Sequence, residues 1–74
     1  MTFTEYAQSK GITLNKDDLA FIKSRIGVLP YAQKIVITRR YIEVWLSHMV
    51  QCENAVKRNN EGRKAANIWI RTVT

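Results

Sequence analysis

The chain has 74 residues, enough for one small domain and too few for two independent hydrophobic cores. Because 46% of the residues are hydrophobic, the composition excludes a disordered polar tail. Twelve lysines and arginines against six acidic residues give a formal net charge of +6, which favours an anionic partner. We therefore expect a single basic domain over residues 1–74.

The first helix is predicted from the signals at its two ends. Thr2 and Glu5 have the spacing of a capping box, in which each residue bonds the other's backbone N–H. Gly11 is a typical stop residue, because glycine readily adopts the left-handed conformation that ends a helix. The sequence thus predicts a helix over about residues 3–10.

A second helix is predicted over about residues 16–26. Asn15 is a good N-cap. Asp17 and Asp18 place carboxylates in the first turn, where they interact favourably with the positive end of the helix dipole. Gly27 is expected to end the helix. Its buried face is expected to consist of Leu19, Ile22 and Ile26.

The third helix is predicted to begin at Pro30, and no further Gly or Pro appears until Gly62. A straight helix over residues 31–59 would be about 44 Å long, which exceeds the diameter of a compact domain of this size. Two alternatives follow. The helix is interrupted, most plausibly in the β-branched run 35–38 or just after it, or its end projects from the domain as a dimer arm.

The C-terminal segment allows two interpretations. Residues 59–62 are expected to form a turn, and residues 62–72 fit a final helix. Residues 67–73 also alternate between apolar and polar, as a strand does, but no partner strand is evident. The helical interpretation is favoured, so the predicted fold is all-α, a small bundle of about four helices with a long central helix for which a bend is one of the two alternatives.

The cellular location is predicted from cysteine use and hydropathy. The single cysteine, Cys52, cannot form an intramolecular disulfide, which favours a reduced, cytoplasmic protein. The N-terminus lacks the basic and apolar regions of a signal peptide. The most apolar stretch, residues 41–50, is far shorter than a transmembrane helix, so no membrane role is expected.

The sequence favours a binding protein over an enzyme. His48 and Cys52 are four residues apart on one helix, but they lack the additional ligands of a zinc site and the orienting group of a nucleophilic dyad. Asp17 and Asp18 are explained by their position at a helix N-terminus. No catalytic residue, metal or cofactor is therefore predicted.

Positive charge is densest between residues 57 and 71, where Glu61 is the only acidic residue. Lysine and arginine in such a cluster neutralise phosphates and release counterions. The predicted nucleic-acid-binding residues of this segment are Lys57, Arg58, Arg63, Lys64 and Arg71, with Asn60 and Asn67 as contacts to phosphates or base edges.

Arg39 and Arg40 form a second basic pair and a predicted second contact. The leading hypothesis is a small regulatory module that binds nucleic acid, with duplex DNA slightly preferred to RNA. Replacing Arg63 and Lys64 by alanine should weaken binding and flatten its salt dependence.

The alternative hypothesis is an inhibitor or adaptor that docks its basic face on an acidic protein. Met49 and Trp69 are the predicted anchors, and Trp69 also fits a core position. A third possibility is a homodimer or structural subunit, because apolar residues recur at seven-residue intervals: Ile35, Ile42, Met49 and Val56. Tyr41 and Trp45, which share a helix face, are predicted to be core residues.

Overall fold

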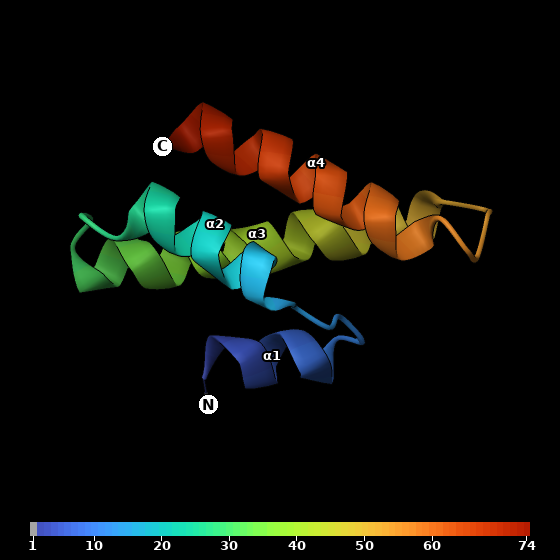
Figure 1. Cartoon of the computed structure of the whole chain (residues 1–74), viewed down its shortest axis with the longest axis horizontal. Helices are drawn as coiled ribbons and strands as arrows, with labels where there is room; N and C mark the ends of the chain where they lie inside the picture. Colours follow the sequence, from blue (N-terminus) through green and yellow to red (C-terminus); the bar gives the residue numbers. More distant parts are fainter. Residues whose placement is uncertain (1) are drawn as a thin grey trace.

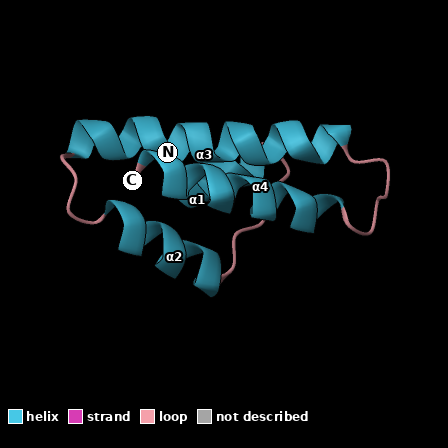
Figure 2. Ribbon diagram, turned by 90° about the horizontal axis from the view of Figure 1, so that it is seen from above, coloured by secondary structure: helices cyan, strands magenta, loops and turns pink. Residues whose placement is uncertain are grey.

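The computed structural model describes residues 2–74, which form four helices and no strands (Figure 1). The helices are α1 (Phe3–Ser9), α2 (Lys16–Ile26), α3 (Tyr31–Gln51) and α4 (Arg58–Val73). The longest, α3, runs the length of the molecule, and α4 returns antiparallel beside it. Figure 2 shows the other three helices on one side of α3, whose opposite side faces solvent. The predicted all-α bundle is confirmed.

The first two helices begin at the predicted caps. The Thr2 hydroxyl accepts from the backbone N–H of Glu5, whose carboxylate accepts from the backbone N–H of Thr2. Asn15 and Asp18 form the same reciprocal pair at the start of α2. Gly11 has a φ of 79°, the left-handed conformation that turns the chain away from α1. Local hydrogen bonding therefore determines both helix starts.

The central helix is interrupted, as one of the two alternatives predicts, but at a different position. It is continuous through residues 35–38, where the Thr38 hydroxyl donates to the backbone oxygen of Lys34 at 2.8 Å. It ends at Gln51 rather than near residue 59, because Cys52 is extended with φ −82° and ψ 121°. The prediction that the long helix is interrupted is correct, but its predicted position is wrong. At 21 residues and about 31 Å, α3 fits the longest molecular dimension of 37 Å.

The reversal between α3 and α4 depends on an asparagine rather than on glycine or proline. The Asn54 side-chain oxygen accepts from the backbone N–H groups of Val56 and Lys57 at 3.0 and 3.2 Å. This local bonding competes with helix formation and stabilises a turn. The predicted turn at residues 59–62 is therefore wrong, since those residues already belong to α4.

Gly62 lies inside α4 because of packing and not because of backbone conformation. A Cβ at this position would lie 2.7 Å from the backbone oxygen of Trp45 and 2.8 Å from Cγ of Met49. Only glycine permits α4 to approach α3 this closely. The segment that also matched a strand is helical to Val73.

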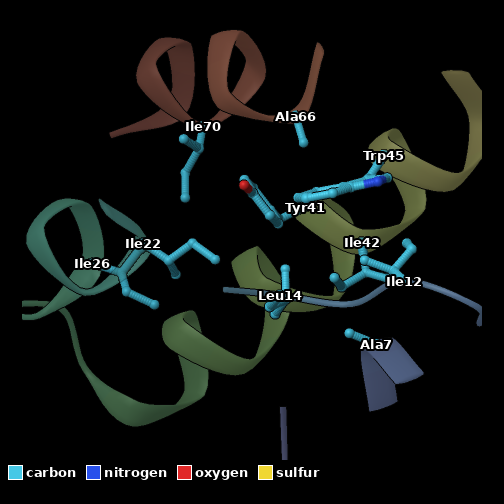
Figure 3. Close-up of a cluster of buried hydrophobic side chains, with 10 residues drawn as sticks. All are labelled: Ala7, Ile12, Leu14, Ile22, Ile26, Tyr41, Ile42, Trp45, Ala66 and Ile70. Atoms are coloured by element: carbon cyan, nitrogen blue, oxygen red, sulfur yellow. The ribbon is translucent and has the colours of Figure 1, made fainter. Parts of the chain in front are cut away.

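The core lies between α3 and the three helices that cover one side of it. Figure 3 shows Tyr41 and Trp45 between α4 and the connection that carries Ile12 and Leu14. Both aromatic side chains are fully buried and pack edge to face, with ring centroids 5.8 Å apart. Their predicted core positions are confirmed. No helix within residues 2–74 has the length and apolar character needed to cross a membrane.

Candidate nucleic-acid interface

Arg63, a predicted phosphate ligand, is committed to an internal ion pair. Its Nε donates to Oδ1 of Asp18 at 2.8 Å, and Nη2 donates to Oδ2 at 3.3 Å. The Asp18 side chain is only 3% exposed, so the pair is largely desolvated. The guanidinium also lies 5.1 Å from the Trp45 ring centroid, within the range of a cation–π contact. Arg63 therefore holds α2 against α4.

Two asparagines of α4 satisfy the polar atoms of the buried aromatic residues. The Tyr41 hydroxyl donates to Oδ1 of Asn67 at 2.6 Å, and Nε1 of Trp45 donates to Oδ1 of Asn59 at 3.2 Å. Burial raises the pKa of the Tyr41 hydroxyl far above its usual value, and Asp18 raises it further while Arg63 lowers it. Asn67, predicted to contact nucleic acid, is thus part of the α3–α4 interface.

Local sequence patterns do not predict these interior polar pairs, because each pair joins residues that are far apart in the chain. Asp18 and Arg63 are 45 residues apart, and Tyr41 and Asn67 are 26 residues apart. Local spacing accounts for the capping bond between Asp18 and Asn15, but not for the ion pair with Arg63, and Asp17 remains exposed. Their different roles follow from the way α2 meets α4.

A row of three cations, which we call the basic row, follows the outward side of α4: the N-cap residue Lys57, and Lys64 and Arg71 within the helix. They are exposed and follow one another at seven-residue intervals, so they lie on one side of the helix about 10 Å apart. The Arg71 guanidinium rests 5.4 Å from the Phe21 ring centroid. Among residues 2–74, only Arg40 and Arg63 have a carboxylate within 4 Å, so the whole row is unpaired.

Arg58 and Asn60 flank the basic row and are only partly available to a ligand. Arg58 donates through Nε to the backbone oxygen of Cys52 at 3.3 Å. Oδ1 of Asn60 accepts from Nη1 of Arg63 at 2.8 Å, which leaves its amide N–H groups for other acceptors. The exposed Glu61 also lies on α4 and reduces the positive charge at that end of the row.

Arg39 and Arg40 do not continue the surface formed by the basic row. They lie on α3, where Arg40 pairs with Glu43 at 3.9 Å on the solvent side of that helix. Arg39 lies 5.9 Å from the ring centroid of Tyr6, which belongs to α1. The structure thus separates the predicted second contact from the α4 cluster.

The proposed anchors and dimer face are largely used within the chain. Met49 and Trp69 are half-buried and pack against the core. Ile42 is 1% exposed, and Val56 lies in the turn after α3 rather than on a helix. The four residues spaced by seven therefore do not form one exposed apolar face, and of them only Ile35 lies at the surface of α3.

His48 and Cys52 lie beside a small depression of about 280 Å³ at the C-terminal end of α3. The Nδ1 atom of His48 is 3.0 Å from the backbone oxygen of Val44, and Cys52 Sγ is 3.6 Å from that of Asn54. Within the described range 2–74, no three His, Cys, Asp or Glu side chains are placed to hold a metal ion.

A comparison of the chain with known proteins found no matching family model, no matching curated protein and no matching solved structure.

Proposed function

We propose that the protein is a small nucleic-acid-binding module that contacts duplex DNA through the basic row of α4. The observation that carries this proposal is the alignment of Lys57, Lys64 and Arg71 on one exposed helix side without carboxylate partners. The row spans about 21 Å. This length allows its cations to meet phosphates on both sides of a major groove about 12 Å wide.

Two further features support contact with phosphates. The α4 N-terminus lacks a side-chain cap, so its first backbone N–H groups are free to donate to an anion beside Lys57. The amide N–H groups of Asn60 lie one helical turn before Lys64. Such contacts position a helix on DNA without reading its sequence.

The test is fluorescence anisotropy of labelled duplex DNA, single-stranded DNA and RNA at low and physiological salt. Wild type should bind duplex DNA with an affinity that falls steeply as salt rises. Replacing Lys64 and Arg71 by alanine should weaken binding and reduce the slope of log K against log salt by about two. Arg63→Ala is unsuitable here, because it would leave the buried Asp18 carboxylate unpaired.

The matched control is the Lys23→Ala/Lys34→Ala variant, which removes the same charge from a different surface. It should retain most of the wild-type affinity and slope. Equal losses in the two variants would mean that net charge rather than the basic row governs binding. Absence of binding at low salt to any of the three nucleic acids would refute the proposed function.

The docking hypothesis based on Met49 and Trp69 is less well supported, because both side chains already pack against the core. A protein partner would need another surface.

A further inference from the structure

An open groove lies between α1, α2 and the N-terminal half of α3, at a distance from the nucleic-acid-binding surface proposed above. Its volume is about 690 Å³, within the range typical of ligand sites. The apolar side chains that matter for its chemistry are Phe3, Tyr6, Leu19, Ile26, Tyr31 and Ile35.

Part of this apolar surface belongs to the core and part faces solvent. Ile26 is buried at the floor of the groove, and Figure 3 shows its side chain beside that of Ile22 on α2. Leu19 and Ile35 are 38% and 37% exposed, and Tyr31 is 78% exposed. Apolar residues that converge in this way on an open groove, rather than being scattered singly, mark an interaction site.

Every charged residue that lines the groove is a cation: Lys23, Lys34 and Arg39. None of them has a carboxylate within 4 Å among residues 2–74. The contact between Arg39 and the ring of Tyr6, 5.9 Å from the centroid, keeps the guanidinium at the groove edge. The groove thus combines an apolar floor with a positively charged rim.

We propose that this groove binds an acidic amphipathic helix of a partner protein. Apolar side chains spaced at i, i+3 or i+4, and i+7 would enter the groove, as in other helix-in-groove complexes. Glu and Asp on either side of that apolar stripe would meet Lys23, Lys34 and Arg39. Charge complementarity of this kind specifies both the partner and its orientation.

A helix suits the groove better than an extended peptide. The groove is walled by helices and offers no strand edge with which an extended backbone could pair. An extended chain would therefore place unpaired N–H and C=O groups against apolar side chains, at a substantial desolvation cost. A helix satisfies its own backbone groups. Since the 11 residues of α2 extend about 17 Å, an occupant of about 11–14 residues matches the length of the groove wall.

Two other occupants fit less well. A second copy of this chain carries a charge of +6 and would bring like charge to the cationic rim. A small amphiphilic anion would leave much of Tyr31 uncovered, because that side chain is 78% exposed at the groove mouth. Small-molecule sites usually enclose most of the ligand surface. A helix lying across the groove covers both the floor and Tyr31.

The experiment titrates the protein into a labelled peptide of about 14 residues that has leucines at i, i+3, i+4 and i+7 and glutamates elsewhere. A peptide of identical composition in scrambled order and a peptide with lysine in place of glutamate serve as controls. Wild type should bind the acidic amphipathic peptide at least about tenfold more tightly than either control. Circular dichroism should show that the peptide becomes helical when bound.

Three double variants of the protein locate the binding site. Lys23→Ala/Lys34→Ala should weaken binding of the acidic peptide at least about fivefold, whereas Lys64→Ala/Arg71→Ala should change it less than twofold. Leu19→Gln/Ile35→Gln, at partly exposed positions, should weaken it about tenfold or more while the far-ultraviolet spectrum stays helical. Both effects together are required, because the proposal combines an apolar floor with a charged rim.

Equal affinity for the acidic peptide and its scrambled control would overturn the proposal. So would equal losses from the two lysine-containing variants, which would indicate diffuse attraction. Displacement of the peptide by dodecanoate at concentrations below the peptide's own Kd would reassign the groove to a small amphiphile. This test is independent of the DNA-binding test. Lys23→Ala/Lys34→Ala should weaken peptide binding more than DNA binding, whereas Lys64→Ala/Arg71→Ala should weaken DNA binding more than peptide binding.

Discussion

The two halves of α3 have different surroundings. The C-terminal half is covered by α4, where Gly62 and Ala66 are small enough to bring that helix close to the buried Trp45. The N-terminal half keeps Tyr31 and Ile35 partly exposed beside the groove. Small residues opposite a large aromatic residue produce close helix packing, whereas apolar residues surrounded by lysine and arginine leave a surface that another molecule can cover.

The two halves of α3 also differ in whether the polar groups around them have partners within the chain. Every buried side-chain nitrogen and oxygen in residues 2–74 has a hydrogen-bond partner, including those of Tyr41, Trp45 and Asp18. The cations around the groove have no carboxylate partner in that part of the chain. The polar groups buried in the covered half are all satisfied within the chain, whereas the open half carries unpaired cations that an anionic partner could bind.

The largest expected effect is a difference in the stability lost on mutation of Ile42 and of Ile35, two isoleucines that lie seven residues apart on the same helix. Ile42→Ala should lower the free energy of unfolding by about 2–5 kcal/mol, because it leaves a cavity around a residue that is 1% exposed. Ile35→Ala should cost less than about 1 kcal/mol, because that side chain is 37% exposed and the site can fill with water. Urea unfolding followed by tryptophan fluorescence measures both.

If Ile42→Ala does not fold, Ile42→Val provides the comparison, with an expected loss of about 0.5–1.5 kcal/mol. Ile35→Val should then lie within about 0.5 kcal/mol of wild type. Equal losses at the two positions would mean that the open half is as closely packed as the covered half.

The next largest effect is a difference in the stability lost on mutation of Asp18 and of Asp17, two adjacent residues at the start of α2. Asp18→Ala should lower the free energy of unfolding by about 2–4 kcal/mol, because it unpairs Arg63 and removes the capping bond to Asn15. This range allows for solvent at the guanidinium, which is 26% exposed. Asp17→Ala removes only an exposed first-turn carboxylate and should cost less than about 1 kcal/mol. Thermal unfolding of both variants measures this difference. Similar melting temperatures would contradict the conclusion that Asp18, and not Asp17, forms a stabilising buried ion pair.

Sequence reasoning succeeds where hydrogen bonding is local. Thr2 with Glu5, and Asn15 with the first turn of α2, define helix starts through groups three residues apart. The buried positions of Tyr41 and Trp45 follow from helical periodicity. These features need no knowledge of how the helices meet.

It fails where one residue type has several physical uses. Glycine is typical of turns, and the sequence predicts a turn that ends at Gly62, but in the structure this glycine permits close packing inside a helix. Charge density predicts that Arg63 binds phosphate together with its charged neighbours, but among the cations of residues 57–71 it is the one that pairs with a buried carboxylate. Both outcomes depend on contacts between segments distant in sequence. The groove is likewise formed by three helices, and periodicity within one helix does not reveal it.

The smallest expected effect concerns the pH dependence of the covered half. Tyr41→Phe removes the hydrogen bond to Asn67 and should cost about 1–2 kcal/mol at neutral pH. Because the pKa of Tyr41 is raised in the folded protein, the unfolded chain loses this proton first, and the hydroxyl's contribution to stability declines above pH about 10. Wild type should then lose up to about 1.4 kcal/mol more per pH unit than the phenylalanine variant. Urea unfolding at about pH 7 and about pH 11 measures this convergence. A constant difference between the two proteins over that interval would mean that the Tyr41 hydroxyl ionises as readily in the folded protein as in the unfolded chain, and hence that α4 does not seal it from water.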